Sequence, residues 1–326
     1  MIKLDYMIQA RGLAKRFRSR AAVVEAVRHV DIDVQAGEVV GFLGPNGAGK
    51  TTTLRMLTTL LAPDAGQAAV AGHDLRREPV AVRRRIGYVA QRGSTSPQAL
   101  VGEELVDHGR LYGLSLAEAD RRGRVMLAQL DLDGTWQRPT GTLSGGQRRR
   151  LDIALGLINQ PPLLFMDEPT TGLDPQSRAN LWGHIRDLRD ARGVTVFITT
   201  HYLEEADALC DRILVIDHGE IVAKGTPAQL KASLSGDRVA LRLLDPARLA
   251  GAQALLHGVP GAKLLRAEGD LLDFSLPDAG AALPALLDGL VRQGAGLAGI
   301  EIHPPTLDDV FLSLTGRELR DQRIAA

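Results

Sequence analysis

The feature that most constrains this 326-residue chain is a glycine-rich stretch, Gly44-Pro45-Asn46-Gly47-Ala48-Gly49-Lys50-Thr51. It fits the pattern G-x-x-x-x-G-K-[ST], in which successive backbone N–H groups form a concavity for phosphate. The apolar run before it, residues 39–43, predicts a short buried strand, and residues 51–61 predict a helix with leucines on one face. Because strand, loop and helix follow in the required order, we interpret the stretch as a phosphate-binding loop rather than a chance match.

Two side chains of this loop suit the phosphates of a nucleotide. Lys50 is a mobile positive charge that can reach the β- and γ-phosphates, and the Thr51 hydroxyl is placed to hold Mg²⁺. The positive end of the helix that follows favours the same negative charge.

Composition indicates a globular protein without a net charge that would favour one class of binding partner. Hydrophobic residues make up 44% of the chain, charged residues 24%, and the formal net charge is +0, so nothing global favours nucleic acid or anionic lipid. The single cysteine, Cys210, excludes an intrachain disulfide and suits a reducing compartment. The first ten residues do not form a secretory signal, and no apolar run approaches the roughly 18 residues that span a bilayer. If the protein acts at a membrane, we expect another chain to bring it there.

Two more buried strands are predicted to end in chemically useful side chains. Residues 163–166 are followed by Asp167 and Glu168, and paired acids in such a place are unfavourable unless something like a nucleotide-bound metal ion neutralises them. We predict Asp167 on the Mg²⁺ side and Glu168 as the group that polarises the attacking water.

Residues 194–200 predict the other strand, which ends at His201. A lone histidine is more often structural. Ligands of open α/β sheets bind at the carboxyl ends of strands, however, so we expect His201 to contact the γ-phosphate.

A helix start at Ser144 is predicted to face an anion. Gln147 stands three residues after this cap, as in a capping box. The two glycines between them cost a helix about 1 kcal/mol each but leave backbone N–H groups open to a ligand. We interpret Arg149 and Arg150, in the same turn, as a solvated basic face.

Two further residues have two interpretations each. Asp174 is predicted to cap a helix that has Pro175 at its first position, and a cap can also face a partner. Phe17 is either an ordinary core or surface residue or a ring that stacks on adenine.

The chain is predicted to contain two domains, residues 1–233 with a helical insertion at about 94–159, and residues 234–326. The second has the element order β-α-β-β-α-β of a small ferredoxin-like unit, followed by a last helix. Its predicted strands are residues 239–244, 263–267, 271–276 and 297–302, and its helices are residues 247–256, 279–293 and 306–314. It carries no catalytic constellation, so we interpret it as an accessory module for regulation or dimer contacts.

Over roughly residues 7–229 these motifs together resemble the ATP-binding subunit of an ABC transporter. The resemblance rests on the phosphate loop, Gln91 as the glutamine loop, residues 143–147 as the signature, residues 163–168 as the second nucleotide strand, Gly172-Leu173-Asp174 as the D-loop and His201 as the switch histidine. It implies a P-loop NTPase of the α/β class, with a RecA-like core, an antiparallel β subdomain and a helical insertion.

The resemblance also implies that the cofactors are ATP and Mg²⁺ and that the site residues fall into three groups. The implied catalytic residues are Glu168, His201 and Lys50, and the implied Mg²⁺ ligands are Thr51, Gln91 and Asp167. The implied nucleotide-binding residues are Phe17, Gly44, Pro45, Asn46, Gly47, Ala48, Gly49, Lys50, Thr51, Thr52, Gln91, Ser144, Gly145, Gly146, Gln147 and Asp174.

Residues 199–207 and 305–312 resemble the daunorubicin-resistance type of drug-export ATPase. This implies a subunit at the cytoplasmic face of the cell membrane that pairs as a homodimer or heterodimer and energises a separate permease for a drug, antibiotic or other lipophilic compound. Residues 94–99 lack the acidic residue expected after Gln91, in a stretch that should face the permease.

Two other classes of ATPase are less consistent with the sequence. Soluble ABC-type ATPases that act on ribosomes usually carry two ATP domains in one chain, and this chain has one phosphate loop. A DNA-repair or chromosome ATPase would carry a coiled-coil or zinc insertion, and no such heptads or cysteines occur. We therefore expect no nucleic-acid partner.

Overall fold

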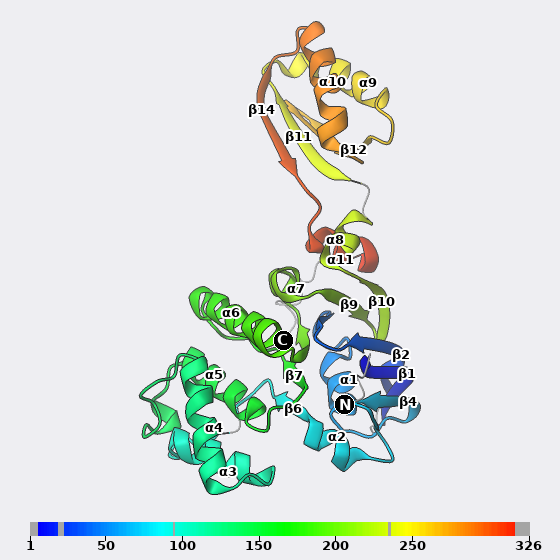
Figure 1. Ribbon diagram of the computed structural model, residues 1–326. Coiled ribbons are helices and arrows are strands. Elements are labelled where there is room, and N and C mark those ends of the chain that lie inside the picture. The colour runs from blue at the N-terminus through cyan, green and yellow to red at the C-terminus, as the bar shows by residue number, and fades with distance from the viewer. Residues whose placement is uncertain (1–5, 19–22, 94, 234–235, 317–326) are drawn as a thin grey trace. The chain divides into compact units, whose positions relative to one another are not determined.

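The computed structural model describes residues 6–18, 23–93, 95–233 and 236–316 (Figure 1). These residues form two compact units, one up to residue 227 and the other from residue 228. Each unit has its own hydrophobic core.

The first unit is built on a six-stranded sheet with the strand order β10-β9-β3-β8-β7-β6. Its members are β3 (Val39–Leu43), β6 (Ile86–Val89), β7 (Leu163–Asp167), β8 (Thr195–Thr200), β9 (Arg212–Asp217) and β10 (Glu220–Gly225). All neighbouring pairs are parallel except β9 and β10, which form the antiparallel hairpin at one edge. Strands β3, β7 and β8 are buried throughout, as their continuous apolar runs predict.

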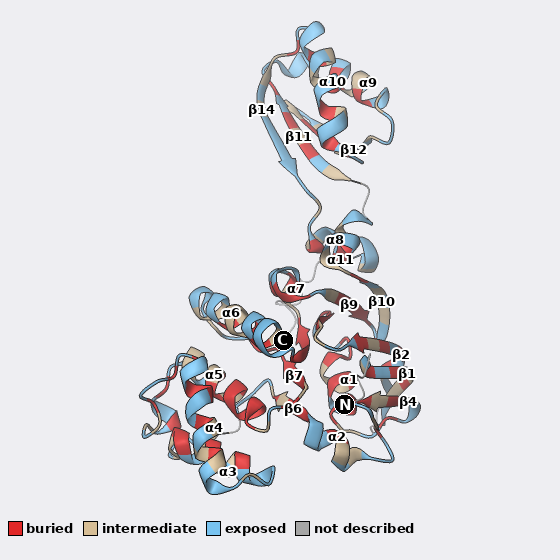
Figure 2. Cartoon of the chain, in the orientation of Figure 1, coloured by how far each residue is buried: buried red, intermediate tan, exposed pale blue. Residues whose placement is uncertain are grey.

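A four-stranded antiparallel sheet with the order β2-β1-β4-β5 completes the β-structure of this unit. It consists of β1 (Tyr6–Arg18), β2 (Val23–Gln35), β4 (Ala65–Val70) and β5 (His73–Asp74). The main core lies between the two sheets and encloses the buried face of α1 (Lys50–Leu57), which supplies Leu54, Met56 and Leu57. Figure 2 shows the buried residues concentrated on these strands and on α1. The helix after the phosphate loop is therefore held from both sides.

The remaining helices of this unit lie in the predicted insertion and around the six-stranded sheet (Figure 1). They are α2 (Pro79–Arg85), α3 (Val101–Leu111), α4 (Leu116–Gln129), α5 (Gly145–Leu157), α6 (Pro175–Arg192) and α7 (Leu203–Leu209), with a short 3-10 turn at Thr140–Thr142. Helix α6 ends at Gly193 in the left-handed conformation, as its glycine predicts.

The second unit has the predicted β-α-β-β-α-β order. Its strands are β11 (Asp237–Leu243), β12 (Lys263–Glu268), β13 (Leu271–Leu276) and β14 (Leu297–His303), and its helices are α8 (Pro227–Ala232), α9 (Leu249–His257), α10 (Ala279–Arg292) and α11 (Leu307–Thr315), with a 3-10 turn at Pro246–Arg248. The strand order β12-β13-β11-β14, antiparallel throughout, is that of a ferredoxin-like sheet. Helices α9 and α10 contribute to its apolar core, which includes Leu241, Phe274 and Leu286.

No helix in the described part of the chain combines the length and apolar character needed to cross a membrane.

Candidate functional site

The phosphate loop joins β3 to α1 through glycines that no other residue could replace without strain. Gly49 has a φ of +105°, and a Cβ there would lie 2.4 Å from the Ala26 carbonyl oxygen. At Gly44 a Cβ would lie 2.2 Å from the Ile216 carbonyl oxygen. The loop therefore runs directly against neighbouring backbone, which fixes its shape.

Lys50 lies folded back over this loop and is almost fully buried. Its Nζ donates to the carbonyl oxygens of Gly44 at 2.7 Å and Pro45 at 3.1 Å, and it lies 3.3 Å from Glu168 Oε1. Burial lowers the pKa of Lys50, and the Glu168 charge opposes that shift. The structure thus brings together two of the three predicted catalytic side chains.

Asp167 links the end of β7 to the start of α1. Its Oδ1 accepts from the Thr51 hydroxyl at 3.1 Å and from the Thr199 hydroxyl at 2.6 Å. Thr199, on β8, was not predicted from the sequence to be part of the site. It also receives the Glu168 backbone N–H through its carbonyl oxygen at 3.0 Å, so it fixes both acids.

Glu168 is the residue on which the predicted groups converge. Besides Lys50, its carboxylate lies 3.3 Å from His201 Nδ1 and accepts from Gln91 Nε2 at 2.9 Å and from the Thr171 hydroxyl at 3.3 Å. Its backbone φ of +45° is unusual for a residue with a side chain and marks a conformation held by its surroundings.

The pKa of Glu168 reflects two opposing influences. Burial would raise it, but the neighbouring His201 and Lys50 side chains outweigh burial and lower the pKa to about 2. The side chain is therefore a carboxylate at neutral pH, as a group that polarises water must be.

The structure contradicts the interpretation of Arg149 and Arg150 as a solvated basic face. Arg149 is buried and donates to the carbonyl oxygens of Pro169 at 2.7 Å, Ala90 at 2.6 Å and Asp167 at 3.1 Å. Arg150 is mostly covered and lies 3.6 Å from Asp131. The prediction was wrong because α5 is buried on more than one face, so its first turn is not free to point into water.

A signal for Arg149 was present in the sequence. Ile153 and Gly156 stand four and seven positions after it, and both are buried. Positions i, i+4 and i+7 lie on one face of a helix, so this pattern places Arg149 on a buried face of α5.

The predicted helix start at Ser144 is confirmed. Its hydroxyl accepts from the Gln147 backbone N–H at 3.2 Å, and Gln147 Oε1 accepts from the Ser144 N–H at 3.1 Å, which completes the capping box. Asp174 caps α6 by accepting from the N–H and hydroxyl of Ser177. No hydrogen bond or ion pair within the described residues joins Ser144, Gly145, Gly146, Gln147 or Asp174 to the phosphate loop.

Phe17 lies near the end of β1 with 44% of its surface exposed. The Lys15 ammonium is 5.8 Å from its ring centroid. An accessible aromatic face with a cation beside it is compatible with base stacking, which stays a prediction.

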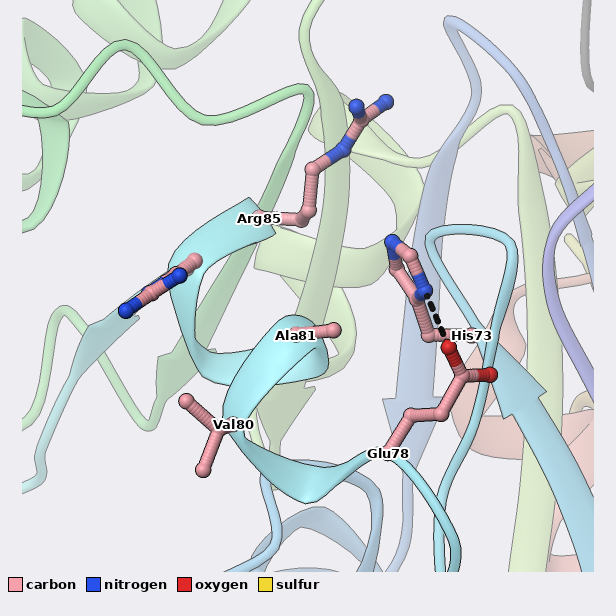
Figure 3. A pocket seen from close by; sticks show the side chains of 6 residues that line it. His73, Glu78, Val80, Ala81 and Arg85 are labelled. Atoms are coloured by element: carbon pink, nitrogen blue, oxygen red, sulfur yellow. Dashed lines mark hydrogen bonds and ion pairs between the residues drawn. The ribbon is translucent and has the colours of Figure 1, made fainter.

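A surface pocket over α2 lies apart from all predicted site residues (Figure 3). It is lined by His73, Glu78, Val80, Ala81, Arg84 and Arg85. His73 Nδ1 and Glu78 Oε1 are 3.2 Å apart across it.

Comparisons with known proteins agree with this geometry. A family model described as ABC transporter matches residues 27–171, and one described as the C-terminal domain of DrrA1-3-like ATP-binding proteins matches residues 225–315. The daunorubicin/doxorubicin resistance ATP-binding protein DrrA of Streptomyces peucetius is 44% identical over 97% of this chain and 94% of its own length. The Nod factor export ATP-binding protein I of Burkholderia lata is 39% identical over 96% of this chain and 98% of its own length.

Solved structures give the same fold for the first unit. The dimeric structure of an ATP-binding cassette in a post-hydrolysis state bound to ADP and Pi has a TM-score of 0.63 and 26% identity, and the match covers 68% of this chain and 98% of that one. The structure of cbiO1 from Clostridium perfringens, part of the ABC transporter complex cbiONQ, has a TM-score of 0.63 over 70% of this chain and 92% of that one, again at 26% identity. The phosphate loop, the converging acids and the near full-length identity to these relatives lead to one conclusion: the chain belongs to the ATP-binding proteins of the ABC transporter family, binds ATP and is an ATPase.

Proposed function

We propose that the protein energises an exporter, and that its ATP hydrolysis drives a separate membrane permease that carries a drug, an antibiotic or another lipophilic compound. The observation that carries this proposal is the 44% identity, over 97% of the chain, to an ATP-binding protein named for daunorubicin and doxorubicin resistance. That match includes the second unit as well as the ATPase unit, so the resemblance extends beyond the motifs that all ABC ATPases need.

In the proposed reaction a water molecule attacks the γ-phosphorus of ATP, the bond from that phosphorus to the bridging oxygen breaks, and ADP and phosphate leave. Glu168, ionised because of its low pKa, accepts a hydrogen bond from the water and orients it. Lys50 and His201, which both lie 3.3 Å from that carboxylate, supply positive charge or hydrogen-bond donors to the γ-phosphoryl oxygens.

Nucleotide binding requires Lys50 to exchange partners. Its ammonium donates to the Gly44 and Pro45 carbonyl oxygens, and these bonds are replaced by bonds to phosphate oxygens. We propose that Pro45 to Thr52 surround the phosphates with backbone N–H groups and that Phe17 stacks on the adenine.

The residues present fit a magnesium ion. The Asp167 carboxylate and the Thr51 hydroxyl are adjacent hard oxygen ligands. Gln91, whose Nε2 donates to Glu168, also carries an amide oxygen of the kind that binds Mg²⁺. Mg²⁺ in phosphate sites takes only one or two protein ligands beside phosphate and water oxygens, so this small set is sufficient. When bound there, the ion would neutralise charge on the β- and γ-phosphates.

We propose that the signature and D-loop residues serve a second copy of the ATPase unit. The hydrogen bonds of Ser144 and Asp174 stay within their own helix starts, and both side chains are exposed, so they are open to a partner's γ-phosphate. Two such sites related by a two-fold axis would make a closed homodimer or heterodimer.

We place the boundary between the ATPase domain and the accessory domain at residues 233 and 234.

The proposal is tested with Glu168→Gln, which keeps the shape of the side chain and removes its charge. This variant should bind ATP but hydrolyse it about 10²-fold or more slowly, because it lacks the group that orients water. Glu204→Gln, the same change at an exposed position, is the matched control. Phosphate release by Glu168→Gln at a rate near that of the wild type would contradict the assignment.

The tagged Glu168→Gln variant then serves as bait in native membranes and cytosol, with and without Mg-ATP. Stoichiometric recovery of a polytopic membrane protein supports the exporter. Recovery of ribosomes or DNA-bound proteins without a membrane partner would contradict export while leaving the ATPase activity intact.

A further inference from the structure

A fully buried carboxyl group that the proposed reaction does not use lies beside the site. Glu205 belongs to α7, which starts two residues after His201, and its exposed surface is 0%. Its Oε1 accepts from the Trp182 indole N–H at 3.3 Å. Since Trp182 is part of α6, Glu205 joins the helix that follows the switch histidine to the helix that follows the D-loop.

The second oxygen of this carboxyl group is one of several buried polar atoms without a hydrogen-bond partner in the described part of the chain. Glu205 Oε2, Thr170 Oγ1 and Arg178 Nε are all buried without a hydrogen-bond partner among the described residues. Burial raises the pKa of Glu205, although the Thr200 and Thr170 hydroxyls and Trp182 act in the opposite direction. A buried carboxyl oxygen without a hydrogen bond is unfavourable, so the packing around Glu205 must hold the group in this place.

The two threonines that influence the pKa of Glu205 flank the two residues that act on the γ-phosphate in the proposed function. Thr170 stands two positions after Glu168, and Thr200 directly precedes His201. A second contact joins the same helices, because the Arg178 guanidinium lies 4.5 Å from the centroid of the Tyr202 ring. That ring is in turn 4.1 Å from the imidazole ring of His201.

We propose that Glu205 is a positioning residue that holds the segment after His201 against α6, so that the side chains of His201 and Glu168 keep their 3.3 Å separation. Its Oε1 accepts from the Trp182 indole N–H on α6. Glu205 touches no reacting atom and transfers no proton. The inference rests on the proposed roles of Glu168 and His201 and adds to them a mechanical link from the D-loop helix to the switch histidine.

The charged and titratable groups near Glu205 come from three directions. Arg178 approaches from α6, Arg149 from α5, and Cys210 lies at the end of α7. Because the link needs an oxygen that accepts from the Trp182 indole N–H rather than a charge, glutamine should replace glutamate there and alanine should not.

The test compares steady-state ATP hydrolysis by full-length variants. Glu205→Ala should lower kcat about 10-fold or more and leave the KM for ATP within about threefold, since the phosphate loop is untouched. Glu205→Gln should restore kcat to within about threefold of the wild type. Glu204→Ala, on the exposed side of the same helix, is the control and should match the wild type.

A double variant separates positioning from general loss of structure. If Glu205 acts through His201, then Glu205→Ala should cause no further loss of kcat in a His201→Ala background. An equal loss in both backgrounds overturns the proposal, as does wild-type kcat in Glu205→Ala. Glu205→Gln as slow as the folded Glu205→Ala overturns the acceptor role of Oε1.

If Glu205→Ala does not fold, Trp182→Phe removes the donor to Oε1 with little change of shape, and unchanged kcat in that variant overturns the proposal. Failure of the proposed function is seen separately, as normal turnover by Glu168→Gln.

Discussion

Arg149→Met removes a buried guanidinium while keeping most of the length and apolar volume of the side chain. Three backbone carbonyl oxygens lose their donor, those of Ala90, Asp167 and Pro169. Asp152, whose side chain is only 10% exposed, loses the cation that lies 3.6 Å away. The substitution therefore tests how far one arginine holds together the strand ends and loops around Glu168.

The expected cost follows from these contacts. A buried acceptor left unpaired costs about 1–3 kcal/mol, and removing one partner of a buried ion pair costs about 3–5 kcal/mol. These contributions overlap, because Asp152 can take up a proton; burial already raises its pKa. We expect the free energy of unfolding to fall by about 3–5 kcal/mol, a large part of the 5–15 kcal/mol that is typical of a native protein.

The assay is urea unfolding followed by the fluorescence of Trp136 and Trp182, the two tryptophans of the chain, both in the first unit. Arg148→Met is the matched control, since Arg148 is exposed and its change should stay within about 0.5 kcal/mol. A loss below about 1 kcal/mol in Arg149→Met would refute the reasoning, because it would mean that water or a neighbouring donor satisfies the three carbonyl groups.

Three further outcomes are expected. Gly49→Ala should weaken ATP binding at least about 10-fold in a fluorescent-nucleotide titration. The φ of +105° and a Cβ 2.4 Å from the Ala26 carbonyl oxygen would force the phosphate loop to move. Unchanged affinity would show that the loop is not rigid at this position. The pKa of Glu168 is about 2 in the folded state against an ordinary 4.5, so the stability that its charge provides should be complete above about pH 4.5 and be lost as the pH falls towards 2. The difference in unfolding midpoint between wild type and Glu168→Gln should therefore shrink between pH 7 and pH 3. A constant difference would argue against the ion pairs. Cys210 is buried with a raised pKa, so its thiol should react with a thiol reagent only after denaturation, and rapid labelling of the native protein would show that α7 opens.

Most of the geometry of the proposed ATP site could be predicted because its signals are local in the chain. The phosphate loop and the capping box at Ser144 each depend on residues within eight positions of one another. The placing of Glu168 and His201 at neighbouring strand ends follows from the parallel sheet, whose carboxyl ends share one edge.

The residues that were missed owe their roles to partners far along the chain. Arg149 reaches Ala90, 59 positions away, and Thr199 reaches Asp167 across a strand pair, 32 positions away. Glu205 lies in a helix whose acidic first turn is equally compatible with a solvated face, and its burial depends on α6 packing over it. Such residues carry no pattern of their own, because long-range packing decides whether a polar side chain meets water or backbone.

The ferredoxin-like unit begins and ends on adjacent strands, since Arg238 of β11 pairs with His303 of β14. A segment whose two ends lie side by side can be inserted into a chain, or lost from it, without separating the residues on either side. Residues 237–303 therefore have the geometry of a segment that can be inserted or lost as a unit. Helices α8 and α11 lie on either side of this segment in the chain, so its insertion or removal would leave both helices intact.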